Sequence, residues 1–309
     1  MSYRGGSGNA SSQTAAFKRM LNDVRSNKTE TKLSGLETIA EQIAFSDGPS
    51  LRNFPVQEAC KEFVKIIQNS NDMAILTLTT QCVVNLLDSI PDSSRQLTNF
   101  NYIQVAKEKL QYDLSKGVLE NIIHSLCTLT KTRAREVGQS LGVKFILKNL
   151  ETLSGPEKHY AVAAMSRFTS YYAISKFAQS LPTIANYFTS NDDQIVQNML
   201  QTFTNILNVV GFSDVPKETI EIMCVSLSVV ANPKVILQIL TLLQRLIFNK
   251  DFSECLIETN LNYENFLTNT DFGNEFPRIR QTTMQIIRSL LPSPDFPTGF
   301  WEGERSIPS

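Results

Sequence analysis

Pairs of apolar residues recur near the ends of long helical segments, at a spacing of about forty residues. The pairs are Ala40/Ile43, Leu87/Ile90, Leu126/Leu129, Met165/Phe168, Phe203/Ile206, Leu243/Leu246 and Ile287/Leu290. Successive pairs lie 47, 39, 39, 38, 40 and 44 residues apart, and most are followed by a polar turn and a second amphipathic segment. Because a single helical hairpin cannot bury its own apolar face, such copies must stack on one another.

A period of roughly 40–47 residues with two or three helices per unit is typical of armadillo and HEAT arrays. Apolar residues recur with helical spacing from Phe17 to about Leu291, and alternating strand-like runs are not apparent. The sequence therefore predicts an all-α, armadillo/HEAT-like right-handed α-superhelix of about six to seven units. The alternative is an irregular α-bundle whose hairpins are similar in length by coincidence.

The predicted repeat domain, residues 17–291, lies between two tails of different composition. Residues 1–16 are mostly Gly, Ser, Asn and Gln and are predicted to be disordered. Residues 292–309 combine Pro and Gly with Phe296, Phe300 and Trp301. These aromatic side chains either dock on the last repeat as a cap or form a short linear motif for another protein, and a terminal repeat's need for a cap favours docking.

Composition limits the setting and the partners. The 29 basic residues nearly balance the 30 acidic ones, so net charge gives no sign of nucleic acid or of an anionic membrane as partner. The N-terminus lacks the apolar run of a secretory signal, and no segment is long enough for a membrane span. Five scattered cysteines in helical contexts are expected to be reduced, buried thiols of an intracellular protein.

Several segments resemble the armadillo region of ubiquitin-fusion-degradation type HECT E3 ubiquitin ligases, the group that includes the thyroid-receptor-interacting ligase. The resemblance covers about residues 17–210 well and 211–291 more loosely. The landmarks are FPV at 54–56, SIPDSS at 89–94, SLCTLTKTRAREVGQSLGVKFIL at 125–147, AVAAMSRFTSYY at 161–172 and KFAQSLPTIANYFTSND at 176–192.

The resemblance implies a function. In that family the armadillo array recruits substrates that carry degradation signals, and a distant HECT domain holds the catalytic cysteine. No cysteine here has the Thr-Cys-Phe setting of HECT chemistry, and Cys127 is assigned to the core. We therefore expect a non-enzymatic protein-interaction scaffold of the nucleus or cytoplasm, without the catalytic HECT domain. The alternative is a general armadillo adaptor, unrelated to ubiquitin, that serves cytoskeletal, transport or signalling complexes.

The sequence contains no recognisable motif for metal binding, cofactor binding or catalysis. His124 and His159 are not spaced with cysteines or carboxylates as metal ligands would be, so no metal or cofactor is expected. Phosphate-loop, nucleophile-elbow and zinc-protease motifs are missing, and no small-molecule substrate is expected. The basic segment KTRARE, residues 131–136, is predicted to be a solvated loop, with contact to an acidic ligand as the alternative.

A partner would bind the concave face built by the last helix of each unit. Armadillo proteins of the importin-α type hold basic peptides there with a Trp/Asn ladder. None of the six corresponding Trp positions is Trp here, and one of the six Asn positions is Asn, which argues against nuclear-signal binding. The same register predicts a groove that contains Asn85, Ser89, His124, Thr128, Arg167, Gln201, Asn205 and Arg245.

Two arginines in this register suggest the chemistry of the partner. The planar fork of arginine suits carboxylates, so Arg167 and Arg245 predict a protein or peptide segment that is acidic or polar. The alternative is that both side chains cover apolar surface with their stems and point their heads to water.

Overall fold

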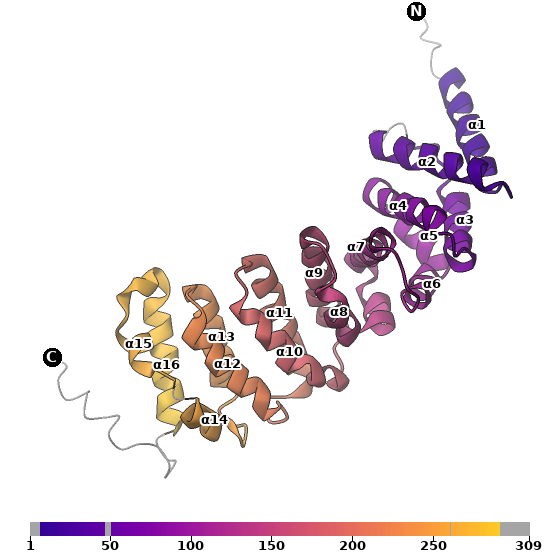
Figure 1. Cartoon of the computed structure of the whole chain (residues 1–309). Helices are drawn as coiled ribbons and strands as arrows, with labels where there is room; N and C mark the ends of the chain where they lie inside the picture. Colours follow the sequence, from indigo (N-terminus) through magenta and orange to yellow (C-terminus); the bar gives the residue numbers. More distant parts are fainter. Residues whose placement is uncertain (1–6, 47–50, 260, 291–309) are drawn as a thin grey trace, which may run out of the picture. The chain divides into compact units, whose positions relative to one another are not determined.

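A computed structural model of the chain describes residues 7–46, 51–259 and 261–290. These residues form helices joined by turns and contain no strand, as the sequence predicts (Figure 1). The chain divides into two compact units at Tyr172/Ala173, called unit 1 and unit 2 below.

Unit 1 is built around four long helices, α2, α4, α7 and α9, each of which packs against the next. The shorter helices α3, α6 and α8 pack against α4, α7 and α9 respectively. The helices of unit 1 are α1 (Ser7–Val24), α2 (Thr29–Phe45), α3 (Val56–Asn69), α4 (Met73–Ser89), α5 (Ser93–Asn99), α6 (Tyr102–Lys109), α7 (Lys116–Leu141), α8 (Val143–Leu150) and α9 (Gly155–Tyr171).

Unit 2 consists of two rows of helices. In one row α11, α13 and α16 pack in order, and in the other α10, α12 and α14 do so (Figure 1). Its elements are the 3₁₀ helix η1 (Ser175–Ser180), α10 (Leu181–Asn186), η2 (Tyr187–Thr189), α11 (Asp193–Val210), α12 (Lys217–Val229), α13 (Pro233–Arg245), α14 (Phe252–Glu258), α15 (Tyr263–Thr268), η3 (Thr270–Glu275) and α16 (Phe276–Leu290).

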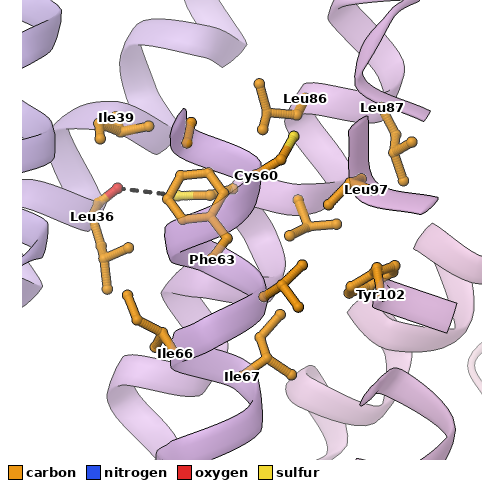
Figure 2. Close-up of a cluster of buried hydrophobic side chains, with 14 of the residues drawn as sticks. Leu36, Ile39, Cys60, Phe63, Ile66, Ile67, Leu86, Leu87, Leu97 and Tyr102 are labelled. Carbon is orange, nitrogen blue, oxygen red and sulfur yellow. Dashed lines mark hydrogen bonds between the residues drawn. The ribbon is translucent and has the colours of Figure 1, made fainter. Parts of the chain in front are cut away.

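The recurring apolar pairs lie in the core. Each pair falls at the C-terminal end of a long helix or in its second half, except Leu126/Leu129, which lies in the middle of α7. Every member of the pairs except Ile90 is buried. Figure 2 shows the result in unit 1, where Leu36 and Phe63, from α2 and α3, share one cluster with residues of α4, α5 and α6. Burial of the pairs confirms the prediction that stacking joins the apolar faces of successive hairpins.

Hydrogen bonds between successive long helices have the same period as the sequence. Asn85 Nδ2 donates to the Ala40 carbonyl, 45 residues earlier. Asn121 Nδ2 donates to the Thr77 carbonyl, 44 residues earlier, and Arg167 Nη1 donates to the Cys127 carbonyl, 40 residues earlier. Each bond thus joins one structural repeat to the one before it.

Prolines and helix caps fall where the sequence places the breaks. Pro55 and Pro216 immediately precede α3 and α12, and Pro233 opens α13. These positions suit proline because the first helical residues have no intrahelical partner for their N–H groups. The Asp192 carboxylate caps α11 by accepting hydrogen bonds from the N–H groups of Gln194 and Ile195.

Two expectations differ from the structure. Residues 7–16, assigned to a disordered tail, lie in α1, whose C-terminal half buries Phe17 and Leu21 and so anchors a helix that continues toward the N-terminus. The segment 131–136, expected to be a loop, lies inside α7, where Arg133 has non-helical angles (φ −133°, ψ 39°) and kinks the helix. Residues 1–6 and the tail at 292–309 lie outside the described residues.

Candidate functional site

The predicted groove residues of unit 1 are largely engaged inside the fold. Asn85 holds the Ala40 carbonyl at 3.0 Å and accepts a hydrogen bond from Gln81. Arg167 Nη1 lies 2.6 Å from Thr130 Oγ1 and 3.4 Å from the Cys127 carbonyl. The head of Arg167 therefore serves α7–α9 packing, and a partner's carboxylate would have to compete with these bonds.

The remaining three predicted residues of unit 1 differ in accessibility. His124 Nε2 lies 3.7 Å from Asp88 Oδ2, and its ring lies 4.2 Å from the Tyr160 ring, so the imidazole links α4, α7 and α9. Thr128 is only 8% exposed, which leaves little of it for a partner to touch. Ser89 is partly exposed at the end of α4.

Unit 2 brings two of the three predicted residues there to an open groove. Gln201 on α11 and Arg245 on α13 line a cavity of about 440 Å³ that extends to Arg278 at the start of α16. Asn205 does not line this cavity; its Oδ1 accepts a hydrogen bond of 2.9 Å from Gln201 Nε2 and so holds the Gln201 side chain. We call this cavity the unit 2 groove.

The unit 2 groove carries a positive charge. Its lining includes three cations, Lys234, Arg245 and Arg278, and a single carboxylate, Glu275. Glu275 Oε2 lies 3.7 Å from Arg278 Nη1, which leaves the lining with a net charge of about +2. The near balance of the whole chain therefore conceals a local excess of positive charge.

Arg245 is positioned at one end of the groove by two neighbours from the α11 side. Its Nη2 donates to Asn208 Oδ1 at 2.9 Å, and its guanidinium carbon lies 4.2 Å from the Phe212 ring centroid. The side chain is nevertheless exposed, so donors of the guanidinium fork remain available on the groove side. Arg245 thus covers an aromatic ring with its guanidinium and also faces the groove, where it could pair with a carboxylate.

Sequence reasoning missed several residues of the groove. Lys234, Gln238, Thr241 and Arg245 follow one another at i, i+4, i+7 and i+11 along α13 and form one stripe. That spacing is visible in the sequence, but the register of the apolar pairs predicts only two groove positions per helix. Arg278 gives no such signal, because it reaches the groove only through the packing of α16 on α13.

The lining is suited to binding a polar chain. The carboxamides of Gln197, Gln201 and Gln238 can donate to and accept from a peptide backbone, and the cations can pair with carboxylates. Among the described lining residues there is no histidine or cysteine to act as a base or nucleophile. Elsewhere in the described ranges, no group of three or more His, Cys, Asp or Glu side chains could hold a metal ion.

The five cysteines are buried and unpaired, as expected from their helical contexts. Burial raises the pKa of the Cys60, Cys127 and Cys224 thiols to about 12 and that of Cys255 to about 11, and it also raises the pKa of Cys82. A catalytic thiolate needs the opposite shift. Across residues 7–46, 51–259 and 261–290, no helix has the length and hydrophobicity required to cross a bilayer.

No protein-family model matches the chain. No curated protein matches it either.

Solved structures give the fold. A beta-catenin structure, from work on its interaction with cadherin, has a TM-score of 0.70 at 13% identity over 90% of this chain and 53% of its own. An engineered protein has a TM-score of 0.62 at 14% identity, with 90% of this chain and 71% of that chain covered. A designed armadillo repeat protein has a TM-score of 0.50 at 11% identity, with 89% and 99% covered. At these identities the likeness concerns the fold alone: the chain has an all-α, armadillo-type fold.

Proposed function

We propose that this chain is a protein-interaction scaffold whose unit 2 groove binds an extended, acidic segment of a partner protein. The observation that supports this most directly is the groove lining, in which three cations and several carboxamides face one open channel. The beta-catenin structure with a similar fold comes from work on a protein partner, cadherin, which agrees with the proposal.

The arrangement of the lining favours a peptide over a small molecule. The groove crosses α11 and α13 and reaches η3 and α16, so a ligand that fills it must span several helices. The stripe Lys234, Gln238, Thr241 and Arg245 alternates charged and neutral polar groups along α13. An extended backbone with carboxylate side chains can satisfy both kinds of group at once.

The test is a binding titration with two fluorescein-labelled peptides, one alternating Glu and Ser and the other alternating Lys and Ser. We expect the acidic peptide to bind and the double variant K234E/R245E to lose affinity by at least about tenfold, because two attractive contacts become repulsive. Arg19→Glu reverses an exposed charge on α1 and serves as the matched control. Equal binding of both peptides, or unchanged affinity in K234E/R245E, would contradict the proposal.

A finer proposal rests on the sequence resemblance. We propose that the scaffold acts in ubiquitin-dependent degradation, as the substrate-recognition array of a HECT-type ligase. Its support is that the landmark segments at 89–94, 125–147 and 161–172 fall, in chain order, on or at the ends of α4–α5, α7–α8 and α9 of the array. The alternative remains a general adaptor unrelated to ubiquitin.

Affinity purification of the full chain followed by mass spectrometry distinguishes these two roles. Enrichment of ubiquitin-conjugating enzymes or of a HECT-containing polypeptide is expected for the ligase role, and its absence with other partners present favours the adaptor. Ubiquitin transfer by the isolated chain would contradict a non-enzymatic scaffold. Five buried, unpaired cysteines support an intracellular setting, nuclear or cytoplasmic, for either role.

A further inference from the structure

The α12 helix in the second row of unit 2 exposes apolar side chains. Ile222, Val225 and Val229 follow at i, i+3 and i+7 and therefore lie along one stripe of the helix. Val225 is 56% exposed and Val229 66% exposed, whereas the opposite side of α12 buries Met223 and Cys224 in the core. The helix is thus apolar on its buried side and on part of its outward side.

The stripe ends at a cavity. Val229 lines a cavity of about 260 Å³ together with apolar side chains such as Phe188 and Val196 and polar ones such as Asn191 and Asp193. A cavity of about 150 Å³ already accommodates a benzene ring, so this mixed cavity has room for a large side chain. The surface therefore offers both a flat apolar strip and a place for an anchoring residue.

Carboxylates gather at the N-terminal end of the stripe, three of them around Lys217. Glu218 and Glu221 lie on α12, and Glu254 and Glu258 lie on the neighbouring α14. The one cation of these two helices, Lys217, is engaged with Glu254 Oε1 at 2.8 Å and Glu258 Oε2 at 3.1 Å. The two helices together carry a net charge of −3, opposite in sign to the unit 2 groove.

We infer that this surface of α12 and α14 docks a basic amphipathic helix from a partner protein. The apolar face of such a helix lies along Ile222, Val225 and Val229 and places one large side chain in the cavity. Its lysines and arginines meet the carboxylates of α12 and α14, which supplies specificity. A second copy using the same surface would bring like charges together, and an anionic membrane would be repelled.

The inference does not depend on the proposed function of the groove, because the two surfaces use different helices and attract opposite charges. The probe is a helical peptide of leucine and lysine, about 18 residues long, compared with a peptide in which glutamate replaces each lysine. Both are labelled with fluorescein and titrated with the full chain.

We expect the Leu/Lys peptide to bind at α12, and any binding of the Leu/Glu peptide, which the positively charged unit 2 groove would supply, to be lost in K234E/R245E. V225S/V229S should weaken binding by at least about tenfold, since two apolar contacts are lost. Val209→Ser, which alters an equally exposed valine on α11, is the matched control and should bind as the natural chain does. Glu218→Lys should also weaken binding, while the alternating Glu/Ser peptide of the groove assay should not compete.

Other results would overturn the inference. Equal affinity of K234E/R245E for the Leu/Lys and Leu/Glu peptides would show that charge plays no part. V209S weakening binding as much as V225S/V229S would show that the site lies elsewhere. Light scattering that reveals a dimer abolished by V225S/V229S would assign the surface to a second copy. Loss of Leu/Lys binding together with groove binding in K234E/R245E would show that the two surfaces are not separate sites.

Discussion

At the scale of single residues, burial determines the behaviour of the thiols. The folded chain keeps the thiols of Cys60, Cys127 and Cys224 protonated, because burial raises their pKa from 9.0 to about 12. We expect iodoacetamide at neutral pH to leave the native chain unmodified and to label all five cysteines after addition of denaturant. Rapid labelling of the native chain, measured by mass spectrometry, would show that the thiols are accessible.

The same thiols predict how stability depends on pH. A pKa that is higher in the folded state contributes stability fully below pH 9, and this contribution is lost as the pH rises toward 12. The free energy of unfolding should therefore fall between pH 9 and pH 11. Urea titrations at fixed pH values measure it, and replacing Cys60 by Ala should reduce the slope. A flat profile over this range would be inconsistent with buried thiols.

Arg167 illustrates what a sequence register does and does not reveal. The register places Arg167 on a long helix, which is α9 in the structure. It cannot show that the guanidinium bonds to Cys127 and Thr130 of the preceding long helix, α7. Arg167→Ala should therefore lower the free energy of unfolding by about 1–3 kcal/mol, through loss of hydrogen bonds between helices. Binding of the acidic peptide, measured well below the unfolding temperature, should change little. A large loss of peptide binding with unchanged stability would show that Arg167 contacts the peptide.

At the scale of helices, close approach of α7 and α9 depends on one residue without a side chain. A Cβ added at Gly138 would lie 2.9 Å from Phe168 Cδ2, and Phe168 is fully buried. Gly138→Ala should cost about 1–3 kcal/mol of stability, because the core must shift to relieve the overlap. Gly155→Ala, whose Cβ would meet no atom within 4 Å, is the control. Thermal unfolding of both variants measures the difference, and equal melting temperatures would contradict this packing.

The helices themselves were largely predictable, whereas their interruptions were not. The pairs Leu126/Leu129 and Met165/Phe168 are buried, as predicted. They were predictable because the helical spacing of apolar residues can be read directly from the sequence. The kink at Arg133 and the start of α1 at Ser7 give no signal in the spacing of apolar residues. For the groove, the α13 stripe was available from spacing, but the contribution of Arg278 required the fold.

At the scale of the whole molecule, a net charge of −1 hides strongly charged surfaces. Helices α13 and α16 carry five cations and no carboxylate, while α12 and α14 carry four carboxylates and one lysine. We expect binding of the acidic peptide to weaken steeply as NaCl rises from about 50 to about 300 mM, because salt screens exposed charges. Affinity that is independent of salt would show that the charges of the groove do not contact the peptide.

The hydrogen bonds that join successive long helices have a consequence for how such a chain can change over evolutionary time. Each of them reaches back one period, yet the periods themselves range from 38 to 47 residues. Between α13 and α16, for example, the chain accommodates α14, α15 and η3, while the two long helices still pack on each other. A lineage can lengthen these connections, and acquire new surface there, without rebuilding the supporting stack.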